Sequence, residues 1–175
     1  VLGGNLYFEH GYFGAPKPGP LVVDSITNFD DSQMQTQRGR VNFTLRQRSN
    51  KYQGLNYGVS GNFMLQHSPM VLAWLDDTSG FYRAYPGAVF LQDQFIGNLD
   101  PFVNYYSRVG FKHSFKGRIL YNNTHQSNDQ DIKSTFIFGD YNFRRDYQFL
   151  QGLEFIGGLS GQYSISDADM YQGGG

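Results

Sequence analysis

The chain has 175 residues and a net charge of −1, with 22 Gly, 16 Phe, 13 Tyr and 1 Trp, but only 5 Ala, 5 Lys and 2 Glu. Exposed helices are rich in Ala, Lys and Glu, so this composition excludes a helical bundle and favours strands and turns. The longest apolar run, Met70–Leu75, is far short of the roughly 20 residues of a transmembrane helix. The interspersed charges exclude a strong field for nucleic acid, and the absence of cysteine excludes disulfides and thiolate metal sites.

Alternating apolar and polar residues predict about seven strands, each of roughly ten residues. In the clearest case Val41, Phe43 and Leu45 share one face. Pro101 falls inside another strand, where its missing N–H predicts a local bulge. In chain order the predicted strands are Asn5–Phe13, Gly39–Ser49, Leu55–Gln66, Phe95–Tyr106, Ser114–Asn122, Ile137–Arg144 and Leu153–Ile165, while Leu21–Phe29 is either an eighth strand or part of a folded loop.

The predicted connections alternate in length, which sends short and long connections to opposite ends of the strands. Aromatic residues gather near both ends, as two interfacial girdles would require. Transmembrane β-barrels of outer membranes have this layout, and a mean hydropathy of −0.48 fits one because only every second strand residue faces lipid. The short connections are Asn50–Gly54, Arg108–Lys112 and Arg145–Gln151, and the long ones are Gly14–Gln37, Ser68–Gln94 and Thr124–Lys133.

Several stretches carry a resemblance to a known family. They are Gly11–Phe13, Lys51–Val59, Asn62–Met64, Tyr85–Gly87, Leu99–Tyr106, Asn128–Gln130 and Phe138–Tyr141. Together they resemble the barrel of TonB-dependent outer-membrane receptors of the Bacteroidetes type. The resemblance implies an all-β, antiparallel transmembrane barrel of 22 strands, plugged by an N-terminal domain, that imports iron complexes, cobalamin or glycans with energy from a periplasmic partner.

By this resemblance, residues 1–175 would be the N-terminal part of the barrel, with seven to eight of its strands, and the plug and the remaining strands would lie outside this stretch. The implied partners are outer-membrane lipid, the protein's own plug domain and TonB system, and a surface lipoprotein or the barrel-assembly machinery; nucleic acid is not expected. Two alternatives stay open. One is a small complete outer-membrane barrel with a structural or passive-channel role, and the other is a soluble sugar-binding β-sandwich.

Two groups of residues are candidates for function. The first would point into the barrel, where it either meets a plug or is solvated: Arg46, Asp100, Arg118, Asp140 and Arg144. The second lies in the long connection 68–94, where it either stacks on a ligand or packs within the loops: Trp74, Asp76, Asp77, Tyr82, Arg83 and Tyr85.

We do not expect catalysis or a cofactor. His67 and His125 have serines nearby in the sequence, Ser68 and Ser127, but neither serine lies in a nucleophile elbow. Residues 125, 129 and 131 supply His and Asp, a spacing that recurs by chance in polar loops, so no metal site is expected.

Overall fold

The computed structural model describes residues 1–9, 35–74, 85, 88–147 and 152–169, which form an all-β fold. Seven strands are present, as predicted. They are β1 (Leu2–Glu9), β2 (Thr36–Arg48), β3 (Leu55–Val71), β4 (Val89–Tyr106), β5 (Phe111–Gln126), β6 (Ile132–Tyr147) and β7 (Leu153–Ala168). Most run several residues beyond the predicted ends, because the backbone ladder continues where the apolar alternation has stopped. The possible strand Leu21–Phe29 lies outside the described residues.

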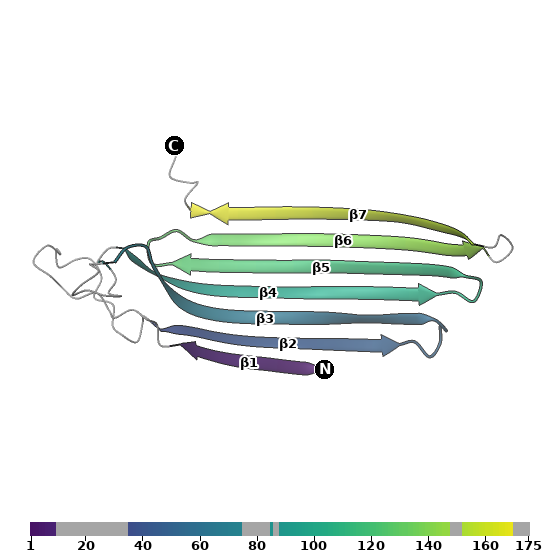
Figure 1. The fold of residues 1–175 in the computed structure, drawn as a ribbon, viewed down its shortest axis with the longest axis horizontal. Helices are drawn as coiled ribbons and strands as arrows, with labels where there is room; N and C mark the ends of the chain where they lie inside the picture. The colour runs from purple at the N-terminus through teal and green to yellow at the C-terminus, as the bar shows by residue number, and fades with distance from the viewer. Residues whose placement is uncertain (10–34, 75–84, 86–87, 148–151, 170–175) are drawn as a thin grey trace, which may run out of the picture.

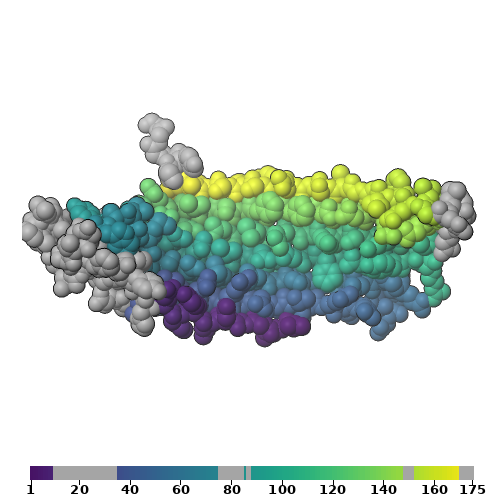
Figure 2. Space-filling view, in the orientation of Figure 1, coloured from purple at the N-terminus to yellow at the C-terminus, as the bar shows by residue number. Residues whose placement is uncertain are grey.

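The strands form one open, antiparallel sheet in the order of the chain. Figure 1 shows this meander, and Figure 2 shows β1 and β7 along its two long edges. The connections β2–β3, β4–β5 and β6–β7 lie at one end, the turn end, and β1–β2, β3–β4 and β5–β6 at the other, the loop end. The prediction of a long connection at 124–133 was wrong: β5 continues to Gln126 and β6 begins at Ile132, so only residues 127–131 form the turn. Asp129, with φ of 58°, helps to close it.

Each strand alternates between two faces, and the register keeps like residues together. Val41 on β2 pairs with Phe63 on β3, and Leu99 on β4 pairs with Ile119 on β5, which pairs with Ile137 on β6. We call this side of the sheet the apolar face and the other the polar face. A slip of one residue would exchange the two faces, so the hydrophobic pattern fixes the register.

Pro101 causes no bulge, contrary to the sequence-based prediction. Leu99 pairs with Ile119 and Phe102 with Lys116, so the register of β4 and β5 is the same on both sides of the proline. The ladder between β4 and β5 lacks only the hydrogen bond that the proline nitrogen cannot donate. Gly117 stands opposite the ring, and a Cβ there would lie 3.2 Å from the Cγ of Pro101. The small partner residue lets the strand pass without an extra residue.

Aromatic rings fill the space above glycines on the apolar face. Gly61 is buried, and a Cβ on it would overlap the ring of Phe43. The rings of Phe43 and Phe63 lie 6.3 Å apart and nearly parallel. Covering a strand glycine with a cross-strand ring offsets part of the glycine's conformational cost.

The sheet has almost no core of its own. Among the described residues Val89 is the only buried large hydrophobic side chain. No helix in the described part of the chain is long and apolar enough to cross a membrane.

Candidate functional site

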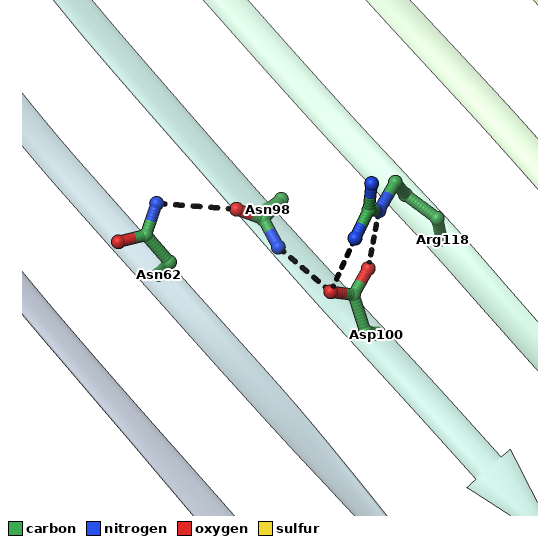
Figure 3. Close-up of polar contacts among 4 residues, drawn as sticks. All are labelled: Asn62, Asn98, Asp100 and Arg118. Carbon is green, nitrogen blue, oxygen red and sulfur yellow. Dashed lines mark hydrogen bonds and ion pairs between the residues drawn. The ribbon is translucent and has the colours of Figure 1, made fainter.

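A chain of polar side chains crosses β3, β4 and β5 on the polar face (Figure 3). Asn62 Nδ2 donates to Asn98 Oδ1 at 3.2 Å, and Asn98 Nδ2 donates to Asp100 Oδ2 at 3.0 Å. Arg118 donates through Nε and Nη2 to the two oxygens of Asp100, at 2.7 and 2.9 Å. Arg40 on β2 adds a fourth strand by donating to Asn62 Oδ1. The two-pronged ion pair and its supporting amides thus link side chains of β2, β3, β4 and β5.

All five residues that sequence reasoning assigned to the interior lie on the polar face, but only Asp100 and Arg118 contact each other. Arg46 Nε donates to Asn56 Oδ1 at 2.9 Å. Asp140 accepts from the Asn142 amide. Arg144 pairs with Asp146 and, at 2.8 Å, with Glu154 of β7. The five residues therefore form several separate contacts along the face.

The apolar face carries exposed hydrophobic side chains in a continuous band. The band runs from Tyr57 to Leu65 on β3, from Phe95 to Tyr105 on β4, and from Phe115 to Tyr121 on β5. We define the apolar band by its exposed aliphatic and aromatic members: Val41, Leu45, Tyr57, Phe63, Leu65, Leu99, Val103, Tyr105, Phe115, Ile119, Tyr121, Ile137, Tyr141, Leu159, Tyr163 and Ile165.

Rings concentrate at both limits of the apolar band. At the turn end, His113 lies 6.1 Å from Tyr105 and 5.1 Å from Phe143, and its Nδ1 is 2.7 Å from the hydroxyl of Tyr141. At the loop end, the rings of Phe95 and Tyr121 are 6.1 Å apart. Aromatic side chains with polar neighbours thus border the band on two sides.

Directly beyond the loop-end limit the same face carries a polar row although the strands continue, and the apolar pairs Pro69–Leu91 and Val71–Val89 follow it. His67 Nδ1 lies 2.7 Å from Asp93, and His125 Nδ1 lies 2.6 Å from Asp131. The hydrogen bond with His125 and, to a lesser extent, the one from the backbone N–H of Gln126 lower the pKa of the Asp131 carboxyl. This row of His–Asp pairs marks the loop-end limit of the apolar band.

The serines near these histidines are used for structure. Ser68 follows His67 in a strand, so its side chain lies on the opposite face, where the Gln66 amide donates to it. Ser127 accepts the backbone N–H of Leu91. Within the described ranges, no group of three or more His, Cys, Asp or Glu side chains could hold a metal ion.

Two of the six loop candidates can be placed. Trp74 and Tyr85 are exposed, and the backbone N–H of Tyr85 donates to Ala73 just beyond the end of β3. The other four lie outside the described residues: Asp76, Asp77, Tyr82 and Arg83. Whether this group binds a ligand stays a prediction.

Sequence reasoning missed the amides Asn62 and Asn98 and the arginine Arg40 as members of the polar chain. The sequence does place all three on the polar face, because each is a polar residue in the alternating part of a strand. The register was needed to show that they meet.

Comparisons of this chain with protein-family models, with curated proteins and with solved structures found no match.

Proposed function

We propose that the seven strands are part of the wall of a β-barrel in a bacterial outer membrane, with the apolar face against lipid and the polar face towards an aqueous interior. The apolar band carries this proposal. It covers 9 residues on β3, from Tyr57 to Leu65, and 11 residues on β4, from Phe95 to Tyr105, which is about the height a tilted strand needs to cross the hydrocarbon core.

The exposure of the band gives the physical reason. Ile119 is 47% exposed and Leu159 is 78% exposed, and an apolar surface of this size is unfavourable in water. A single sheet with so little buried surface also cannot offset the conformational entropy lost on folding. The band therefore requires a cover, and acyl chains supply one of the right height.

The two sheet edges support a larger assembly. β1 and β7 each pair with one neighbour only among the described residues. Unpaired N–H and C=O groups along an edge are costly in a membrane, so the strands of a membrane sheet must close into a ring. The seven strands of the described residues fall short of the even number, eight or more, that bacterial barrels use.

The finer proposal rests on the family resemblance. We propose that the barrel belongs to a TonB-dependent transporter that imports a nutrient such as an iron complex, cobalamin or a glycan. Its partners would be outer-membrane lipid, a plug domain, the TonB system, and a surface lipoprotein or the barrel-assembly machinery. The polar chain of Asn62, Asn98, Asp100 and Arg118 supports a wet or plug-covered interior, because its groups bond mainly to one another.

Neighbouring positions on β7 test the membrane assignment. The chain has no cysteine, so Leu159→Cys and Ser160→Cys can each carry a single fluorescent label. Both positions are exposed and they lie on opposite faces. In vesicles with nitroxide-labelled lipid, we expect strong quenching at position 159 and little at 160. A protein that is monodisperse in plain buffer, with no quenching at either position, would instead support the sandwich.

Energy dependence separates the transporter from a passive channel. In cells that depend on the full-length protein for a nutrient, a protonophore should abolish uptake by a TonB-driven importer. Uptake that persists after the proton gradient collapses would contradict the importer and support the small barrel with a passive-channel role.

A further inference from the structure

Four arginines follow one another along the polar face of β2. They are Arg38, Arg40, Arg46 and Arg48, separated by Asn42 and Thr44 on the same face. We call these four side chains the arginine lane. From Arg38 to Arg48 the strand rises about 34 Å, so the lane extends past the whole height of the apolar band on the other side of the sheet.

The arginine lane has no carboxylate partner among the described residues. The polar faces of β1, β2 and β3 carry one carboxylate there, Glu9 at the loop end, and it accepts from the hydroxyl of Tyr7. The guanidinium of Arg38 lies over the ring of Tyr7, 4.9 Å from its centre. The register places no acidic residue directly opposite the four arginines on the described parts of β1 and β3.

Elsewhere on the polar face the strand cations are matched with acids, except for Lys112, whose ammonium lies over the ring of Tyr106. Arg118 is paired with Asp100, and Arg144 with Glu154. Lys116 stands directly opposite Asp140 in the register. If the arginines of β2 only served to keep the face hydrated, the pairing seen on β4 to β7 would do the same on β2. The concentration of unpaired cations on one strand calls for a separate explanation.

Two of the arginines are oriented by amides rather than by acids. Arg40 donates through Nε to Asn62, and Arg46 donates through Nε to Asn56. A bond at Nε fixes the plane of the guanidinium and leaves the Nη groups available for a second, two-pronged contact. Such a contact is the one that carboxylate and phosphate groups make best.

Between these two arginines the polar face carries amides, hydroxyls and one paired acid. They are Asn42, Thr44, Ser60, Asn62, Asn98 and Asp100. Thr44 and Ser60 are hydrogen-bonded to each other at 3.1 Å. This stretch offers mainly neutral donors and acceptors at mid-height, with Arg40 beyond one end of it and Arg46 beyond the other.

We propose that the arginine lane is a binding path for small polyanions, molecules with several carboxylate or phosphate groups, with its central position between Arg40 and Arg46. The inference rests on the proposed function, because a polyanion can reach the arginine lane only if the polar face is open to water. Rows of Arg or Lys along a pore favour anions in this way.

Binding to the full-length protein in detergent micelles tests the proposal. Tripolyphosphate and tricarballylate are titrated by calorimetry, and uncharged raffinose serves as the neutral probe. We expect both anions to bind, raffinose not to bind, and affinity to fall when salt is raised from about 20 to about 300 mM. A preference between the two anions would identify phosphate or carboxylate as the favoured group.

Matched variants separate a specific lane from general positive charge. Arg40→Gln with Arg46→Gln should weaken anion binding by about tenfold or more, because two charge-assisted contacts are lost. Lys116→Gln with Arg145→Gln removes the same charge outside the lane and should change affinity less than about twofold. Equal losses in both pairs, an unchanged affinity in the first pair, or no anion binding by the folded protein would each overturn the proposal.

In the same preparations position 160 carries the fluorescent label through Ser160→Cys. The membrane assignment and the arginine lane are therefore tested separately. Lipid quenching at position 160 would refute the wet polar face and with it the membrane assignment. Normal quenching behaviour without anion binding would refute the arginine lane alone. Circular dichroism confirms that each variant keeps its β-structure.

Discussion

Replacing Ile119 by arginine gives the most direct energetic test of the apolar band. Ile119 lies in the row with Gly61, Leu99 and Ile137, and Gly61 is midway between the two ends of the band on β3. An arginine at the middle of the hydrocarbon costs a membrane barrel about 2 to 4 kcal/mol, whereas one near the interface costs about 0 to 1 kcal/mol. Asn123 supplies the interfacial control, because it lies on the same face of the same strand and pairs with Lys133.

The two positions are four residues apart, or about 14 Å along the strand. We therefore expect Ile119→Arg to lose about 2 to 3 kcal/mol more stability than Asn123→Arg, which is a factor of about 30 to 140 in the folding equilibrium constant. Ile119→Ala accounts for the lost side chain, since it removes the apolar contact without adding charge. The assay is reversible urea unfolding in lipid vesicles, followed by circular dichroism.

The decisive observation is how the cost of an arginine changes with its depth in the membrane. Equal costs for arginine at positions 119 and 123 would mean that no hydrocarbon layer distinguishes them. A cost at position 119 that is just as large in detergent-free buffer would mean that protein, and not lipid, covers the band.

Three further substitutions test local features. Gly117→Ala brings a Cβ to 3.2 Å from the Cγ of Pro101, so we expect a loss of about 1 kcal/mol in urea unfolding that largely disappears in a Pro101→Ala background; simple additivity would contradict this contact. The lowered pKa of Asp131 means that its contribution to stability is present above the usual aspartate pKa and is lost as the pH falls through the lowered value. A carboxyl NMR titration should place the midpoint of Asp131 below the usual aspartate range, and His125→Asn should return that midpoint to the usual range. A midpoint that His125→Asn does not change would be inconsistent with the hydrogen bond between His125 and Asp131. Gly54 has φ of 85°, and a Cβ there would overlap the carbonyl oxygen of Tyr106, so Gly54→Ala should cost about 1 to 3 kcal/mol in the same unfolding assay; an unaltered urea midpoint would show that the turn adapts.

The alternation of apolar and polar residues was sufficient to predict the seven strands. It failed where alternation is absent: the stretch from Thr124 to Gln126 is polar on both faces and was predicted to be part of a loop, yet backbone hydrogen bonds extend β5 through it. The bulge expected at Pro101 was wrong for a related reason. The cost of a missing N–H depends on the residue opposite, and Gly117 on the next strand accommodates the ring.

The faces of the candidate residues could be predicted, but their partners could not. Period-two alternation places Asp100 and Arg118 on the same side of their strands, and the structure agrees. Which cation meets which acid depends on register, and a shift of two residues keeps every face while changing every pair. For that reason the amides Asn62 and Asn98 escaped notice.

The place where the apolar band stops argues more strongly for lipid than its hydrophobicity does. A second protein layer could cover an apolar face for as far as the strands extend, as in a sandwich. Here β3, β4 and β5 continue beyond the band as regular paired strands, while the same face changes to the polar row of His67, Asp93 and His125, with the apolar pairs Pro69–Leu91 and Val71–Val89 beyond that row. The change occurs next to Phe95 and Tyr121, whose rings are 6.1 Å apart. A cover of fixed thickness with an aromatic boundary explains a limit that cuts across neighbouring strands, whereas the extent of protein packing would follow the ends of the strands themselves.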